Sequence, residues 1–181
     1  MSKSKLDRRT FFMRTGVSVG GAALLYSCHR PGETWSFLKE AEASTLSAML
    51  DRIIPGDEDP GALEAGVIYF IDRQLVGPYR RYQQDYRNGL NHLQSTSEAL
   101  YGDPFDQLTP GDQTRILEGL EKNEVPPDIW SEPSAPPFFN LVVDHAMQGF
   151  YGSPIHGGNK DFASYSMLGI ELPIDYDGSQ S

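Results

Sequence analysis

Cysteine is almost absent from this chain of 181 residues, because Cys28 is its only one. A single thiol excludes an intramolecular disulfide and the zinc or iron–sulfur sites that several cysteines would hold. The C-x-x-C-H motif that attaches haem c and the G-x-G-x-x-G motif that binds dinucleotides are also missing. No apolar run approaches the roughly 20 residues of a permanent membrane-spanning helix. We therefore expect no cofactor and no metal in this chain, and no membrane span.

Basic residues are scarce beyond the first 27 positions. That segment holds five of the 15 lysines and arginines but only one of the 25 aspartates and glutamates. The remaining chain has 10 basic and 24 acidic residues, a formal charge near −14. Such a surface repels phosphate backbones, which excludes nucleic acid as an expected partner. The acidity instead suits solubility or docking onto a basic partner.

The beginning of the chain has a distinctive pattern. Arg8 and Arg9 are followed by Phe11 and Phe12, and then by a glycine-rich, mildly apolar stretch. This order is typical of a twin-arginine signal, which directs folded proteins across the bacterial inner membrane. The alternative is a basic tail before a short buried helix, but three glycines would weaken such a helix. We predict that the twin-arginine translocase exports this chain to the periplasm.

The signal ends at Leu25-Tyr26-Ser27-Cys28, which is similar to a lipobox. In that motif a small residue precedes a cysteine that is acylated and becomes the mature N-terminus. Ser27 fits the motif, whereas Tyr26 is bulkier than usual. The alternative is simple cleavage near Ser27, and we favour lipidation of Cys28. Either way, residues 1–27 form the predicted signal peptide and residues 28–181 a single domain.

The mature chain predicts an all-α fold, a small bundle of about five helices with irregular loops and a C-terminal tail. Apolar residues recur at intervals of three and four, and no strand pattern of convincing length occurs. A proline-rich loop is expected over residues 123–137 and an irregular tail over 152–181. The expected helices cover residues 35–54, 61–76, 79–100, 109–120 and 138–150, with the last at the centre of the bundle.

The run Tyr79-Arg80-Arg81-Tyr82 offers two interpretations. Tyrosines beside arginines can form a stacking platform for a ligand. Here the tyrosines fall on the apolar stripe of a predicted helix and the arginines beside it. We therefore favour helix packing flanked by salt bridges.

A histidine-containing segment, residues 144–159, is the densest cluster of candidate site residues. Asp144, His145 and His156 could form a metal site or an acid–base pair, although helical metal spacing is missing. Gly157-Gly158-Asn159 suits a tight turn. We expect His145 to donate a hydrogen bond to that turn, with an interface role second and catalysis third. The interface or structural candidates are His145, Phe150, Tyr151, Pro154, Gly157, Gly158, Asn159, Phe162 and Tyr165.

An ordered set of motifs runs through most of the mature chain. The set comprises Leu50-Asp51-Arg52-Ile53-Ile54-Pro55, Asp59-Pro60-Gly61-Ala62-Leu63-Glu64-Ala65-Gly66-Val67, Ile71-Asp72-Arg73-Gln74-Leu75, Tyr86-Arg87-Asn88-Gly89-Leu90, Phe105 with Leu108-Thr109, Phe138-Phe139, His145, Gly149-Phe150-Tyr151, Pro154, Gly157-Gly158-Asn159 and Leu168-Gly169. Together these motifs resemble the gluconate 2-dehydrogenase subunit 3 family. At residues 164–166 many members carry a tryptophan that this chain lacks.

The resemblance implies a non-catalytic partner of a larger enzyme. In such complexes a flavoprotein of the glucose–methanol–choline type, which holds FAD, oxidises a sugar or sugar acid. A multihaem cytochrome c carries the electrons onward, and the small subunit escorts the flavoprotein and provides the export signal. The alternative hypothesis is an independent periplasmic lipoprotein that acts as an enzyme or metal-binding protein through Asp144, His145 and His156. We expect the partner interface at residues 150–159 or in the apolar tail 162–173.

Overall fold

The computed structural model describes residues 35–131 and 134–170. Within them the fold is all-α, with no strand, which confirms the predicted fold class. No helix of this part of the chain is both long and apolar enough to cross a membrane. The α-helices are α1 (Glu40–Ile53), α2 (Val67–Leu75), α3 (Gln83–Tyr101), α4 (Pro110–Lys122), α5 (Ala135–Tyr151) and α6 (Ala163–Met167), joined in part by the 3-10 turns η2 (Arg80–Tyr82), η3 (Phe105–Gln107), η4 (Pro154–His156) and η5 (Lys160–Phe162).

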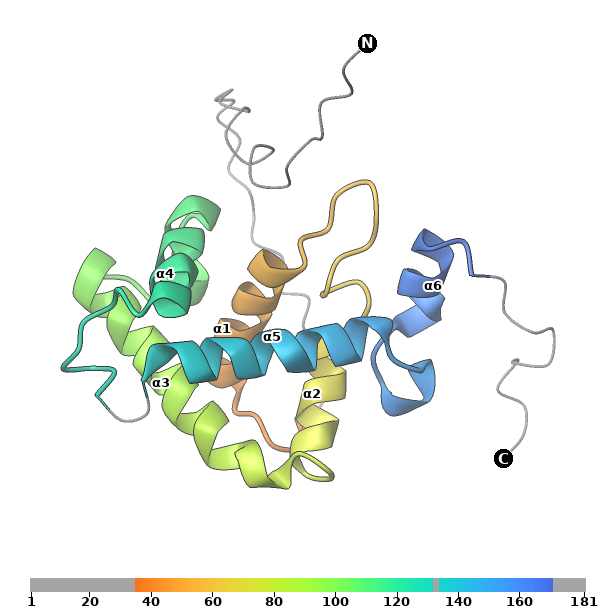
Figure 1. The fold of residues 1–181 in the computed structure, drawn as a ribbon, viewed down its shortest axis with the longest axis horizontal. Coiled ribbons are helices and arrows are strands. Elements are labelled where there is room, and N and C mark those ends of the chain that lie inside the picture. Colours follow the sequence, from red (N-terminus) through yellow and green to blue (C-terminus); the bar gives the residue numbers. More distant parts are fainter. Residues whose placement is uncertain (1–34, 132–133, 171–181) are drawn as a thin grey trace, which may run out of the picture.

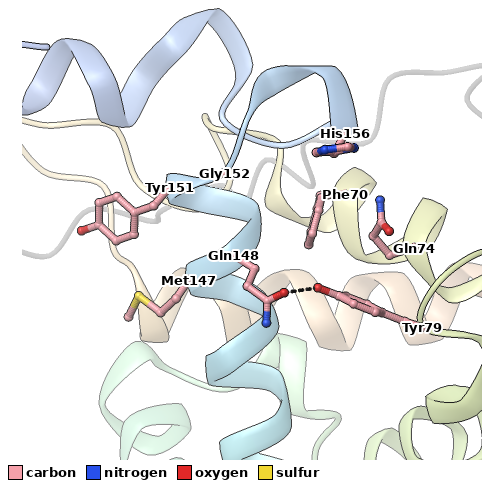
Figure 2. A pocket seen from close by; sticks show the side chains of 8 residues that line it. All are labelled: Phe70, Gln74, Tyr79, Met147, Gln148, Tyr151, Gly152 and His156. Atoms are coloured by element: carbon pink, nitrogen blue, oxygen red, sulfur yellow. Dashed lines mark hydrogen bonds between the residues drawn. The ribbon is translucent and has the colours of Figure 1, made fainter.

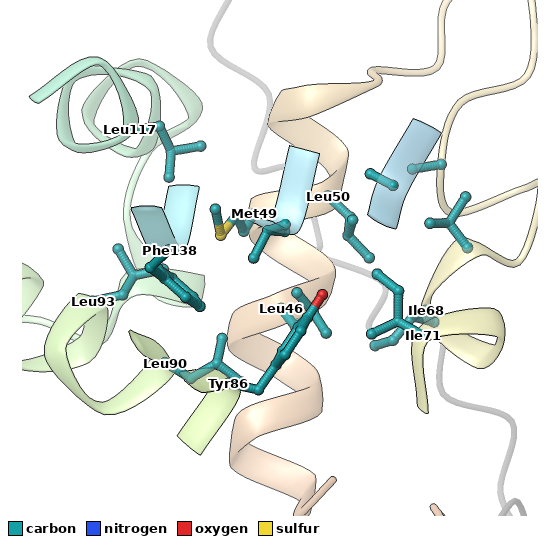
Figure 3. Packing of buried hydrophobic residues seen from close by; sticks show 14 of the residues in the cluster. Leu46, Met49, Leu50, Ile68, Ile71, Tyr86, Leu90, Leu93, Leu117 and Phe138 are labelled. Carbon is teal, nitrogen blue, oxygen red and sulfur yellow. The ribbon is translucent and has the colours of Figure 1, made fainter. Parts of the chain in front are cut away.

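Helix α5 is central in the arrangement, as expected. It crosses the bundle in the view of Figure 1 and contacts each of the other five α-helices named above. Its inner face buries Phe138, Val142 and Phe150. Figure 3 shows the core between α1, α2 and α3, where Leu46 and Met49 are fully buried. The predicted five helices thus gather around one core, with α6 added beside the end of α5.

Three helices begin several residues later than the sequence suggested: α3 starts at Gln83 rather than residue 79, after the 3-10 turn η2, and α1 and α2 are displaced further. Helix α1 starts at Glu40 because the Glu42 carboxylate accepts a hydrogen bond from the backbone N–H of Lys39 at 2.8 Å, which closes the first turn. The expected start at residue 35 is therefore wrong. Helix α2 starts at Val67 rather than residue 61, because Gly66 takes a left-handed conformation with φ of 69°. That conformation interrupts a right-handed helix, and glycine adopts it at little cost.

The later part of the chain is more helical than expected. Helix α5 starts at Ala135, so the last three residues of the predicted loop are helical. Pro136 and Pro137 fall in its first turn, where the missing N–H groups need no partner. The expected irregular stretch from residue 152 contains η4, η5 and α6. Residues 171–181 of the expected tail lie outside the described residues.

A buried carboxylate on α2 anchors the segment before α1. Asp72 accepts hydrogen bonds from the backbone N–H groups of Ser36 at 2.7 Å, Phe37 at 3.0 Å and Leu38 at 2.9 Å. Arg87 adds a hydrogen bond to the Phe37 carbonyl oxygen at 2.8 Å and lies over the Phe37 ring. Several charge-assisted bonds to one carboxylate hold a segment far better than a single neutral bond. The chain is therefore attached to the bundle from residue 36 onward.

Candidate functional site

A histidine between two tyrosines occupies the junction of α3, η2 and α5. The ring of His145 stacks on Tyr79 at a centroid distance of 3.9 Å and lies parallel to Tyr86 at 5.9 Å. Tyr82 meets the same ring edge-on at 5.2 Å. The Tyr86 hydroxyl and His145 Nδ1 are hydrogen-bonded at 3.0 Å, deep in the core. The tyrosine stripe therefore packs on α5, as predicted, with His145 as its contact.

The surroundings of His145 keep its ring neutral. Burial lowers the pKa of His145 to about 4, and Arg81 acts in the same direction, while Asp144 partly opposes them. Burial and the nearby Tyr79 also raise the pKa of Tyr86 well above its ordinary value. A histidine that protonates near pH 4 is a poor acid–base catalyst at neutral pH. The expected hydrogen bond from His145 to the glycine turn is wrong, because Nδ1 is bonded to Tyr86 instead.

An open groove lies on the outer side of this cluster, between α2 and the end of α5 (Figure 2). Its volume is about 630 Å³. Tyr151 and Met147 on its α5 side are 45% and 40% exposed, so the groove presents apolar side chains to solvent. Tyr79 donates a hydrogen bond to Gln148 across the groove. The lining residues are Phe70, Gln74, Tyr79, Met147, Gln148, Tyr151, Gly152 and His156, none of them acidic.

Arginines flank both ends of the groove, Arg80 and Arg81 beside Tyr79 and Arg73 beside Gly157. Arg80 and Arg81 follow Tyr79 directly, and the Arg81 guanidinium lies 4.6 Å from the centre of the Tyr82 ring. The Arg73 guanidinium packs over Gly157, since a Cβ atom added to that glycine would be 3.1 Å from its Nη1. Among the described residues no carboxylate lies within 4.0 Å of these three side chains. The expected salt bridges at Arg80 and Arg81 are therefore wrong.

The glycine turn joins three elements. Asn159 is fully buried, and its side chain donates to the Gly152 carbonyl oxygen and accepts from the Ser164 N–H, each at 2.9 Å. The Lys160 N–H reaches the Ala65 carbonyl oxygen at 2.9 Å. Gly158 has no room for a side chain, because a Cβ atom would lie 2.2 Å from the Gly149 oxygen. The turn thus fixes the ends of α5 and α6 against the start of α2.

Asp144, His145 and His156 are the candidates for a metal site, and they do not form such a site. His145 is buried, while Asp144 and His156 are exposed on α5 and η4. The described residues contain no group of three or more histidine, cysteine, aspartate or glutamate side chains that could hold a metal ion. The metal-binding form of the alternative hypothesis therefore has no support from the described residues.

The other candidate residues divide between surface and core. Phe150 is buried in α5 and Tyr151 is exposed beside it. Pro154, Phe162 and Tyr165 are partly exposed. Sequence reasoning missed Phe70, Gln74, Met147 and Gln148, although the apolar Met147 and Tyr151 at four-residue spacing are a signal for an exposed helical face. The export residues Arg8, Arg9, Phe11 and Phe12, and the lipidation candidate Cys28, lie outside the described residues.

The comparisons decide the family. No curated protein and no solved structure matches this chain. Residues 40–171 match the family described as gluconate 2-dehydrogenase subunit 3. The chain belongs to this family. The match begins at the first residue of α1 and covers every helix, which confirms the resemblance found in the motifs. The family name is that of one subunit of a multi-subunit dehydrogenase, consistent with an accessory subunit.

Proposed function

We propose that this chain is the non-catalytic small subunit that escorts a flavin-dependent sugar or sugar-acid dehydrogenase, helps it mature and exports it to the periplasm. The observation that carries the proposal is the combination of Arg8-Arg9 with a domain of the gluconate 2-dehydrogenase subunit 3 family. A translocase for folded proteins can carry a bound partner that has no signal of its own. FAD then belongs to the large subunit, of the glucose–methanol–choline type, and haem c to a cytochrome c subunit.

The structure is compatible with this role at one further point. The neutral, buried His145 serves packing rather than proton transfer, and an exposed apolar groove remains for a partner. An escort protein acts through such a surface, because apolar area that a partner covers contributes to binding.

The test is replacement of both arginines by lysine in the full chain, co-expressed with the large subunit. We expect the Arg8→Lys/Arg9→Lys double variant to retain both proteins in the cytoplasm, measured by fractionation and by flavin-linked dehydrogenase activity in the periplasm. Replacement of Lys3 and Lys5 by arginine is the control, since it changes basic residues of the same segment and leaves the arginine pair intact. Normal periplasmic activity with the double variant would refute the proposal.

A further inference from the structure

The groove and its arginines have a composition unlike the rest of this acidic chain. Nine lysines and arginines lie in the described residues, and five of them are within 4.0 Å of a carboxylate. The other four are Lys39, at the start of α1, and Arg73, Arg80 and Arg81, although acidic residues outnumber basic ones in the mature chain. In an acidic protein, arginines that have no carboxylate partner and lie at the two ends of one groove are available for carboxylates of another molecule.

The same region exposes the residue types that dominate protein interfaces. Tyrosine, methionine and arginine are enriched in interface centres, whereas aspartate, glutamate and lysine are depleted there. The groove offers Met147 and Tyr151 from α5, and Ile155, which is 66% exposed, follows in η4. The carboxylate nearest to them in α5 is Asp144, one turn before Met147 and Gln148. An apolar strip edged by arginines is thus presented to solvent.

The partner's chemistry follows from the charges. We propose that this arginine-edged groove, formed by the groove residues with Arg73, Arg80 and Arg81, is the docking surface for the large dehydrogenase subunit. The occupying segment inserts apolar or aromatic side chains between α2 and α5 and places carboxylates against the arginines. A second copy of this chain is the poorer occupant, because each mature copy has a formal charge near −14 and the copies repel.

This inference rests on the proposed function, and the experiment separates the two. The full chain is co-expressed with the tagged large subunit, and the affinity of the purified proteins is measured. We expect Tyr151→Asp and the Arg80→Glu/Arg81→Glu double variant each to weaken binding by roughly 30-fold or more, the loss typical of central interface residues. Binding by the unaltered chain should also weaken as salt is raised, and the double variant should lose most of that dependence.

Matched controls lie elsewhere on the surface. Leu100→Asp changes an apolar residue that is 54% exposed at the end of α3. Arg115→Glu/Lys122→Glu makes the same change of charge on α4, and both side chains are more than half exposed. These variants should bind within about threefold of the unaltered chain, because scattered surface residues contribute little. Circular dichroism confirms that every variant is folded.

Each result has a definite meaning. If the unaltered chain binds no large subunit, the proposed function is wrong. If it binds and the groove variants bind equally well, the docking surface is wrong while the function stands. A dimer of the isolated chain that the arginine double variant dissociates would make the groove a contact between copies, and would also overturn the inference.

Discussion

His145 shows how one buried side chain couples stability to pH. Its pKa in the folded chain is about 4, below the ordinary value of 6.5, so the unfolded chain binds more protons between these two values. The folded state therefore has its full stability above pH 6.5, and this stability decreases as the pH falls towards 4. We expect the free energy of unfolding to decrease by about 3 kcal/mol over this range. Urea denaturation at a series of pH values measures it.

The control for this prediction is His145→Phe, which keeps an aromatic ring between the tyrosines but cannot bind a proton. The variant loses the hydrogen bond to Tyr86 and is less stable at neutral pH, yet its stability should depend less steeply on pH. Burial also lowers the pKa of His92, which is present in both proteins, so its contribution cancels in the comparison. Equal pH dependence of stability in the two proteins would contradict the assignment of this effect to His145.

Sequence periodicity could predict part of this cluster. The positions of Tyr79, Tyr82 and Tyr86 place them on one stripe, and the apolar run around His145 indicates a buried helix. Periodicity describes one element at a time, however. His145 and Tyr86 are separated by 59 positions, so their contact depends on how α3 and α5 cross. For the same reason, neighbours in the sequence could not predict that Arg80 and Arg81 have no carboxylate partner among the described residues.

Among the helices, the crossing of α3 and α5 depends on one glycine. A Cβ atom at Gly89 would lie 2.1 Å from Cδ2 of Phe138, so the two helices approach too closely for any side chain. We expect Gly89→Ala to destabilise the domain by about 1–3 kcal/mol, as overpacking does, despite alanine's better helix propensity. Thermal or urea denaturation measures the loss.

Gly111 provides the matched control in α4. The nearest atom to a Cβ atom there is Thr109 Oγ1 at 4.0 Å, so an alanine meets open space. Gly111→Ala should leave the stability unchanged or raise it slightly, because alanine has less conformational freedom to lose on folding. If Gly89→Ala were as stable as Gly111→Ala, the close approach of α3 and α5 would be wrong.

The helix boundaries show what local patterns miss. Apolar spacing identified the existence of five helices, because each buries a stripe against α5 or α1. It placed α2 too early, since the residues before Val67 are also apolar and only the left-handed Gly66 separates them. It placed α5 too late, because prolines that break a helix interior are tolerated in a first turn. Boundary errors of this kind come from backbone geometry at single residues.

For the whole molecule, we predict a lipid anchor at Cys28 that holds the protein at the membrane. We expect the full chain to incorporate labelled palmitate and to fractionate with membranes, and the Cys28→Ser variant to do neither. The variant has no acylated residue, so it should appear in the soluble periplasmic fraction. Its presence there also controls for export, because a protein retained in the cytoplasm would not reach that fraction. An unaltered chain without label would favour simple cleavage near Ser27.

The anchoring of residues 36–38 by Asp72 limits how far the domain can travel from a lipid on Cys28. Only residues 29–35 separate that cysteine from the fixed segment, and fully extended they span about 25–30 Å. If Cys28 is lipidated as we predict, this short tether would keep the side of the bundle that carries Asp72 within one domain diameter of the bilayer. A partner enzyme bound to the same domain would then work at the membrane surface. Lengthening the tether would let that enzyme move away from the surface without altering any contact within the complex.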